Sequence, residues 1–304
     1  MSETGHREYA RRGHSLTFLG TGAACGVPSF YCGCEACKEA RVNPRAARGC
    51  SGLLIRGRQQ LLIDAAPELR LQLIREGVEQ IDALLLTPEH FDHLGGIPQL
   101  EFFVRLKSKA PLPVYAGART LAAIESSFPF MTDVLEARLI RPFVTIQLDG
   151  LNYTPLPAAH GEETFGFLIE TSPPSSAPDA PPAPDAPPAP DAPPAPDAPP
   201  APPFRVAYFP DTGPLPPQTM ERLAGLDVFI IDATFTKTNW MPTSHHTVGE
   251  ALALIHKLAP ARAYLTHLAM HYDEPLTLAE LEGTLDAYAG RAQVAFDGLN
   301  LPLS

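Results

Sequence analysis

The chain has 304 residues, of which 45% are hydrophobic and 19% charged, and its formal net charge at pH 7 is −11. Its length suffices for a large core. No apolar run approaches the roughly 20 residues that a membrane-spanning helix needs, and residues 1–15 lack the apolar centre of a signal peptide, so we expect a cytoplasmic protein that does not enter a membrane. The acidic charge disfavours nucleic acid as a partner, because phosphate backbones call for basic surfaces.

Short apolar runs alternate with segments of helical periodicity along the chain. In chain order, the expected strands are 16–19, 52–56, 61–64, 83–87, 114–116, 153–156, 164–170, 204–209, 227–232, 262–266 and 293–296. The expected helices are 68–76, 99–107, 120–126, 217–224, 247–257 and 278–288. This pattern predicts two packed sheets with helices outside them. We place a single domain at residues 15–304, after a flexible N-terminus at residues 1–14.

Residues 173–203 differ from the rest of the chain. They hold 16 of the 35 prolines and repeat the sequence Ala-Pro-Asp-Ala-Pro-Pro from Ala177 to Pro200. Such a tract lacks the apolar side chains of a core, so we expect an extended, disordered loop. A docking segment for a proline-binding module is one interpretation, and a neutral repeat expansion is the one we favour. Because strands are expected on both sides, the tract interrupts one domain.

A group of metal-binding side chains directly follows the strand that ends near Thr87. His90, Asp92 and His93 fall within four residues, and two imidazoles and a carboxylate at one turn cannot all face inward without partners. Coordination of a metal ion satisfies all three. The pattern H-x-H-x-D-H would complete such a loop, but Pro88 stands at its first position and has no ligand atom to offer.

Single residues of the same kind follow later strands. His160, Asp211 and His267 each lie just beyond the end of an expected strand. One such residue alone is more often a cap, whereas three of them together with the His90–His93 loop predict a metal site. Asp64 also ends an apolar strand, where orienting a ligand histidine and capping a turn are both open.

Three of the five cysteines are crowded together as Cys32, Cys34 and Cys37. In a cytosolic protein this spacing favours metal over disulfides. Three thiolates bind one tetrahedral zinc ion when a fourth ligand joins them. Three reduced thiols without a metal are the alternative.

Together these motifs resemble the metallo-β-lactamase superfamily, in its phosphoribosyl 1,2-cyclic phosphate phosphodiesterase branch. The resemblance extends from about Leu16 to Leu303, without the proline tract. It rests on residues 19–28, the cysteine cluster, and residues 62–65, 87–96, 160, 210–212, 231–235, 265–267 and 296–299. The coenzyme-PQQ biosynthesis protein of the superfamily shares the early glycine- and cysteine-rich region, which leaves both branches open.

The resemblance implies a four-layer αβ/βα sandwich in the α/β class, with two divalent metal ions, Zn or Mn, in the active site. The implied ligands are Asp92, His93 and His267 for one ion, His90 and His160 for the other, and Asp211 as a bridge between them. In the family a histidine occupies the position of Pro88. The second ion therefore has one ligand fewer, and we expect it to bind weakly.

Two further roles follow from the resemblance. His245 matches the position of the family's general acid, although a loop histidine that caps the next helix is the alternative. The family's structural zinc takes its fourth ligand from a histidine just after the last catalytic one. Here Met270 lies at that spacing, and we choose His271 because imidazole is a far better zinc ligand than a thioether.

We therefore expect a metal-dependent hydrolase that cleaves a small phosphodiester, with a cyclic ribose phosphate as a candidate, by attack of a metal-bound hydroxide. Its partner would be this small molecule, and a homodimer stays open. One alternative is a metal-binding accessory protein with little turnover, like the PQQ biosynthesis protein, and Pro88 favours it. Another is a lactone or thioester hydrolase of the same fold.

Overall fold

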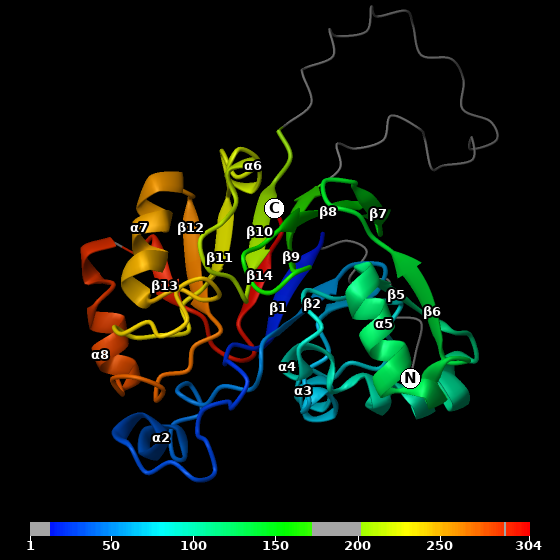
Figure 1. The fold of residues 1–304 in the computed structure, drawn as a ribbon, viewed down its shortest axis with the longest axis horizontal. Coiled ribbons are helices and arrows are strands. Elements are labelled where there is room, and N and C mark those ends of the chain that lie inside the picture. Colours follow the sequence, from blue (N-terminus) through cyan, green and yellow to red (C-terminus); the bar gives the residue numbers. More distant parts are fainter. Residues whose placement is uncertain (1–12, 172–201, 289) are drawn as a thin grey trace, which may run out of the picture.

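The computed structural model describes residues 13–171, 202–288 and 290–304. Two seven-stranded sheets pack face to face, and helices cover their outer sides (Figure 1). This arrangement confirms the predicted αβ/βα sandwich. The proline tract up to residue 201 and the N-terminal segment up to residue 12 lie outside the described residues. His14, which we assigned to the flexible terminus, is held by hydrogen bonds to Asp149 and Leu303.

The two sheets have the same number of strands and a mixed topology. The first contains, in spatial order, β14 (Asn300–Pro302), β1 (Ser15–Gly20), β2 (Gly52–Arg56), β3 (Gln60–Ile63), β4 (Ala83–Leu85), β5 (Leu112–Ala116) and β6 (Leu135–Leu139). The second contains β13 (Ala292–Val294), β12 (Arg262–Thr266), β11 (Val228–Asp232), β10 (Arg205–Phe209), β9 (Phe165–Thr171), β8 (Leu151–Pro157) and β7 (Ile146–Leu148).

Strand direction brings the predicted ligands to one edge of each sheet. In the first sheet β3 and β4 are parallel. In the second sheet β10, β11 and β12 are parallel, and β8 has the same direction because β9 is antiparallel to both β8 and β10. The carboxyl ends of these strands lead into the segments that contain Asp64, His90, His160, Asp211 and His267. The chemistry of the chain is therefore concentrated where parallel strands end, as in other α/β proteins.

Helices line both outer faces. Beside the first sheet lie α3 (Leu69–Arg75), α4 (Phe91–Leu94) and α5 (Ala118–Ser127), and over the second sheet lie α7 (Val248–Leu258) and α8 (Leu278–Gly283) (Figure 1). The described residues also form two short helices, α2 (Glu35–Ala40) and α6 (Pro217–Met220). They further contain 3-10 turns at Ile97–Leu100, Pro129–Met131 and Asp286–Tyr288 and a π-helical segment at Phe103–Ser108.

Three apolar layers hold these elements together. The layer between the sheets contains large buried side chains from both, among them Phe18, Tyr153, Phe167 and Tyr208. A second layer packs the outer face of the second sheet against α7 and α8, and a third packs the first sheet against α3 and α5. Because the central strands of both sheets are covered on both faces, their sequences are almost continuous apolar runs.

Several expected elements differ in the structure. The helix expected at 99–107 is a 3-10 turn followed by a π-helical segment, and the one expected at 278–288 ends at Gly283 before a separate turn. Helix α2 and strands β6, β7 and β14 were not expected. Strand β6 has the sequence LEARL, in which apolar and charged residues alternate as in a half-buried strand, so the sequence held a signal that was overlooked.

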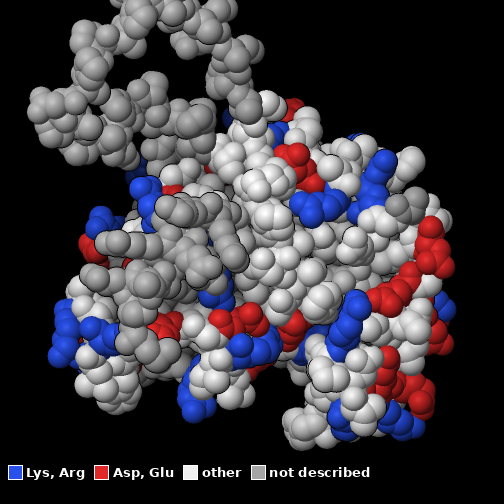
Figure 2. Space-filling view, turned by 180° about the vertical axis from the view of Figure 1, so that it is seen from behind, with Lys and Arg blue, Asp and Glu red and all other residues white. Residues whose placement is uncertain are grey.

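The surface carries charges of both signs. On the face in Figure 2, Lys and Arg side chains are interspersed with Asp and Glu side chains around a broad uncharged area. Within the described ranges, no helix combines the length and the apolar character that a bilayer crossing requires.

Candidate metal centre

The loop after β4 presents its side chains in two directions. His90 precedes α4 in an extended conformation (φ −73°, ψ 150°), and Asp92 and His93 lie buried in the single turn of α4. Phe91, between them, points outward and is 67% exposed. Because residues of a helical turn face different directions, a ligand pair at positions 92 and 93 can be buried while its neighbour faces water.

Asp92, His93 and His267 form the first donor group. One potential ligand atom from each lies within 4.8 Å of the other two. The Oδ2 atom of Asp92 is 3.4 Å from Nε2 of His93 and 3.3 Å from Nε2 of His267. The two imidazole rings are stacked, with centroids 5.5 Å apart. The structure thus brings together the three residues that we expected to bind one ion.

His90, His160 and Asp211 form the second donor group, again with atoms within 4.8 Å of one another. Nε2 of His160 lies 3.0 Å from Nδ1 of His90, which is 3.6 Å from Oδ2 of Asp211. The same Oδ2 atom lies 3.4 Å from Nε2 of His93. Asp211 therefore stands between the two groups, at the place expected of a bridging carboxylate.

The chemistry of these groups fits divalent cations. Nε2 of His93 is buried and has no hydrogen-bond partner in the part of the chain that is described, whereas Oδ1 of Asp211 lies 2.9 Å from Nδ1 of His160. Unpaired polar atoms of this kind are costly unless something else satisfies them. Imidazole and carboxylate together suit Zn or Mn, and a cation at the first group would satisfy Nε2 of His93.

Asp64 holds His93 from the side opposite to its Nε2 atom. Its Oδ2 atom lies 2.9 Å from Nδ1 of His93, and its Oδ1 atom accepts a hydrogen bond from the backbone N–H of Thr87 at 2.9 Å. All three residues are buried, and Asp64 has a left-handed backbone with φ of 70°. An acceptor at Nδ1 places the proton there and leaves Nε2 free as a ligand atom. The contact supports an orienting role for Asp64 rather than a turn cap alone.

Asp232 and Thr234 make similar contacts with two other histidines. The Oγ1 atom of Thr234 lies 2.9 Å from Nδ1 of His267, and Oδ2 of Asp232 lies 3.0 Å from Nδ1 of His245. His245 is also 3.2 Å from Oδ1 of Asp211. We had treated residues 231–235 only as part of a family motif. The signal that was overlooked is the one used for Asp64, namely a carboxylate that ends a fully buried strand.

The charges of the centre reinforce one another. Burial by itself would raise the pKa of Asp92 and of Asp211, but the nearby imidazoles hold both pKa values below their ordinary range. Burial would lower the pKa of His93, yet Asp92 and Asp64 raise it. Positive charge is thus favoured between these carboxylates, whether protons or a cation supply it. Because a ligating imidazole is neutral, a metal would bind in competition with protons.

Pro88 is buried and interrupts the donor pattern at the position where we noted a missing histidine. Its neighbour Glu89 forms an ion pair with Arg119 and is thereby directed toward α5. Glu89 therefore does not replace the missing ligand in this arrangement. The second donor group consists of His90, His160 and Asp211 alone.

The cysteine cluster lies apart from these groups. The sulfur atoms of Cys32, Cys34 and Cys37 lie within 4.8 Å of one another at the start of α2. His271, our choice of fourth ligand, is not within this group. Both of its ring nitrogens are buried and lack a hydrogen-bond partner among the residues described, and burial lowers its pKa. The structure brings three of the four proposed zinc ligands together and leaves the fourth a proposal.

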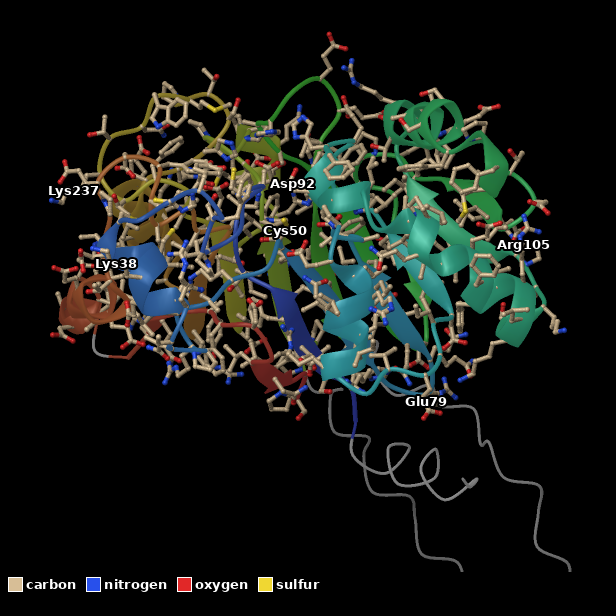
Figure 3. The ribbon with its side chains drawn as sticks, turned by 90° about the horizontal axis from the view of Figure 1, so that it is seen from below. Lys38, Cys50, Glu79, Asp92, Arg105 and Lys237 are labelled. Atoms are coloured by element: carbon tan, nitrogen blue, oxygen red, sulfur yellow. The ribbon has the colours of Figure 1, made fainter. Side chains whose placement is uncertain are left out.

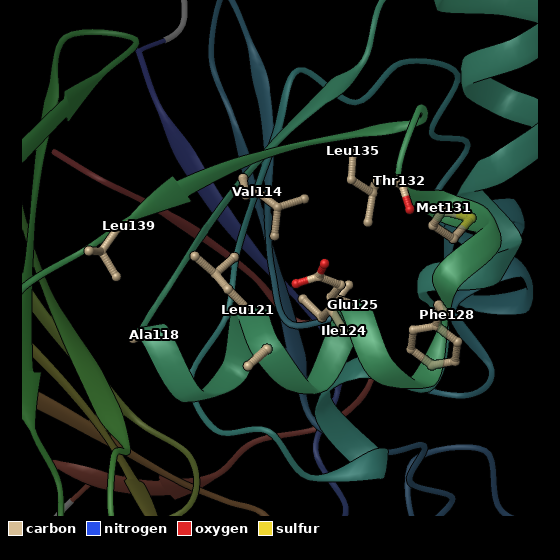
Figure 4. A pocket seen from close by; sticks show the side chains of 12 residues that line it. Val114, Ala118, Leu121, Ile124, Glu125, Phe128, Met131, Thr132, Leu135 and Leu139 are labelled. Atoms are coloured by element: carbon tan, nitrogen blue, oxygen red, sulfur yellow. The ribbon is translucent and has the colours of Figure 1, made fainter.

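A separate cavity differs from these clusters in the side chains that line it. It has a volume of about 530 Å³ and lies between α5 and the strands β5 and β6 (Figure 4). Its lining is apolar, with side chains such as Leu121, Ile124 and Met131, and Glu125 is the one charged residue among them. Such a lining does not suit a metal, so the candidate centre is the His/Asp cluster around Asp92, near the middle of the view in Figure 3.

Comparison with known families identifies the superfamily of the chain. Residues 59–177 and 201–268, well over half of the chain, match the model of the beta-lactamase superfamily domain. The chain belongs to this superfamily. The matched ranges contain all six His and Asp residues of the two donor groups.

Individual relatives differ in how much they share. Coenzyme PQQ synthesis protein B from Methylorubrum populi is 27% identical, over 95% of this chain and 99% of its own length. An octanoyltransferase from Porphyromonas gingivalis is 30% identical over 47% of this chain, and the match spans only 30% of that protein. Among solved structures, a diphosphatase of the PhnP family is similar with a TM-score of 0.75 and 27% identity, covering 95% of this chain and 97% of the other.

Proposed function

We propose that the protein is a metal-dependent hydrolase of small phosphodiesters, with a cyclic ribose phosphate as the first substrate to test. The observation that carries this proposal is the pair of His/Asp donor groups that share Asp211. Divalent cations at two adjacent sites would supply Lewis acidity for attack by water and offset negative charge on a phosphate. The similarity to a diphosphatase of the PhnP family supports phosphate chemistry.

The residues around the donor groups fix their geometry. Asp64 orients His93, and Thr234 orients His267, so that the Nε2 atoms of both face Asp92. His160 donates from Nδ1 to the carbonyl oxygen of Ser244 at 2.8 Å, and its Nε2 atom faces His90. Because each ring is held by its other nitrogen, the ligand atoms are in place before a cation or a substrate arrives.

His245 is our candidate for the general acid. Burial would lower its pKa, but the hydrogen bond and charge of Asp232, together with Asp211, raise it. A raised pKa favours the protonated imidazole, the form that a general acid needs. With Nδ1 held by Asp232, the proton on Nε2 is the one that His245 can donate to a leaving alkoxide.

The test combines elemental analysis with hydrolysis of bis(p-nitrophenyl) phosphate and of cyclic ribose phosphates. We expect hydrolysis that chelation abolishes and added Zn or Mn restores. The variant His245→Asn should keep its metal and lower kcat by about 10²- to 10⁴-fold, as expected for a general acid. A protein with its full metal content that hydrolyses none of these substrates would refute the proposal.

A second candidate is a metal-binding accessory protein with little turnover. Two observations favour it, namely Pro88 in place of a ligand and the similarity to coenzyme PQQ synthesis protein B along nearly the whole chain. The same assay separates the two candidates, because the accessory protein would bind metal without hydrolysing phosphodiesters.

A further inference from the structure

The second donor group depends on two loops that come from different sheets. His90 lies in the loop after β4 of the first sheet, and His160 lies in the loop after β8 of the second. Their ring nitrogens Nδ1 and Nε2 are only 3.0 Å apart. The distance between the two loops therefore decides whether this group can hold a cation.

Each loop carries glutamates beside its histidine, and these glutamates converge on one arginine. Glu89 directly precedes His90, and Glu162 and Glu163 follow His160. Arg119, in the first turn of α5, forms ion pairs through Nε with Glu89 and through Nη1 with Glu162.

The backbone of α5 takes part in the same junction. The N–H of Arg119 donates to Oε2 of Glu163 at 2.7 Å. A Cβ atom on Gly117, the residue before α5, would collide with the Glu163 carboxylate. The helix therefore begins against this carboxylate, and three acidic side chains from two loops meet at the first turn of one helix.

We propose that Arg119 is a positioning residue that fixes the spacing of His90 and His160. The three carboxylates would repel one another without a cation between them, and repulsion would move the loops apart. The planar guanidinium joins Glu89 and Glu162 at the same time, which a single-point ammonium group cannot do with the same geometry. This inference rests on the proposed function, because it assumes that the second donor group binds a cation.

The expected effect is on metal affinity more than on folding. Arg119 and Glu162 are 49% and 81% exposed at their side chains, and exposed ion pairs contribute little to stability. Residues that orient metal ligands, in contrast, typically change the affinity for the metal by about 10- to 100-fold when they are replaced. Since Pro88 leaves this donor group with three protein ligands, its affinity depends strongly on their spacing.

The test is a zinc titration against a competing chelator, on the full-length chain and on Arg119→Ala. It follows the two binding steps of the His/Asp cluster, after zinc at the cysteine cluster has been assigned with Cys34→Ser. We expect the tighter binding step to be unchanged and the weaker step to lose about tenfold in affinity. Arg119→Lys should lie between the two, and Glu162→Gln, which removes one arm of the junction, should weaken the same step. The melting temperature of each variant shows whether it is folded.

Arg105→Ala is the matched control. Arg105 also joins two carboxylates, those of Glu101 and Asp133, at 2.8 Å each. Figure 3 shows it at the edge of the molecule, away from Asp92. Its replacement should change neither binding step.

The outcomes separate this inference from the proposed function. Unchanged affinities in Arg119→Ala, an equal loss in both steps, or the same loss in Arg105→Ala would overturn the positioning role. Uptake of a single ion by the unaltered chain at the His/Asp cluster would overturn the two-ion centre, and the inference with it. Two ions and the expected loss, but no hydrolysis, would support the role of Arg119 and refute only the hydrolase.

Discussion

Replacing Asp64 by Asn tests how the centre is oriented. The carboxylate accepts from Nδ1 of His93 at 2.9 Å and from the backbone N–H of Thr87 at 2.9 Å, and the Thr87 hydroxyl donates to the same group. An amide has one oxygen and cannot accept from both sides. If that oxygen stays with Thr87, the amide N–H₂ faces His93 and favours the tautomer with its proton on Nε2, the ligand atom.

The structure decides between Asn and Ala for this experiment. Ala would leave three buried donors unpaired, at roughly 1–3 kcal/mol each, or roughly 3–9 kcal/mol in all. It would also place alanine, which disfavours the left-handed backbone region, at φ of 70°, and this costs roughly another 1–2 kcal/mol. This total rivals the whole stability of a typical domain, about 5–15 kcal/mol, so Asp64→Ala would confuse unfolding with loss of metal. Asn tolerates the left-handed backbone and keeps one acceptor.

We expect Asp64→Asn to bind metal at the Asp92/His93/His267 group about 10- to 100-fold more weakly, measured by competition titration. Asp149→Asn is the control, because Asp149 also has a positive φ, of 50°, and also contacts a histidine, His14. Asp149 precedes β8, whereas His160 follows it, so this contact lies away from the metal centre. The control variant should leave metal affinity unchanged. If both variants bind metal like the unaltered chain, Asp64 does not act through His93.

Four further outcomes are expected. Replacing Pro88 by His should tighten the weaker metal site and raise phosphodiesterase activity without added metal, so an unchanged affinity would contradict our account of this position. Cys34→Ser should release about one zinc and lower the melting temperature, as loss of a structural zinc does, whereas full metal content and stability would exclude such a zinc. Deleting Ala177–Pro200 should change neither the melting temperature nor the metal content. Thr171, at the end of β9, is hydrogen-bonded to Phe204, just before β10, so a short turn can join the two strands. Insoluble protein would show that the tract packs or assembles. The pKa of Glu250 is lowered from 4.5, because hydrogen bonds from the helix N-cap outweigh the effect of burial. The carboxylate therefore stabilises the fold fully above pH 4.5, and this contribution is lost as the pH falls through the lowered pKa. Between pH 5 and 3 the melting temperature of Glu250→Gln should fall less than that of the unaltered chain, and an equal fall would count against the cap.

Much of the fold was predictable because burial on both faces leaves a clear trace in the sequence. Strands β2 and β12 match their expected bounds, and Thr247 begins α7 with a capping box formed with Glu250. Local chemistry specifies such elements. Strand β6 was missed although apolar and charged residues alternate in its LEARL sequence, which is the signal of a half-buried strand, and it pairs with β5. The helix expected at 99–107 failed because the backbone there follows 3-10 and π geometry, which has no distinctive sequence signal.

The sequence by itself determined which residues are available for chemistry. Imidazoles, carboxylates and thiols at strand ends can be recognised one at a time, and the absence of a donor at Pro88 is visible in the same way. Only the tertiary structure decided which of them meet. Asp232 reaches His245 and Glu89 turns to Arg119 through contacts that no spacing encodes. The three cysteine sulfurs gather as their spacing predicted, but without His271. The reason is that a ligand group is closed by segments from two sheets, which the packing of the apolar layers and the ion pairs of Arg119 with Glu89 and Glu162 bring together.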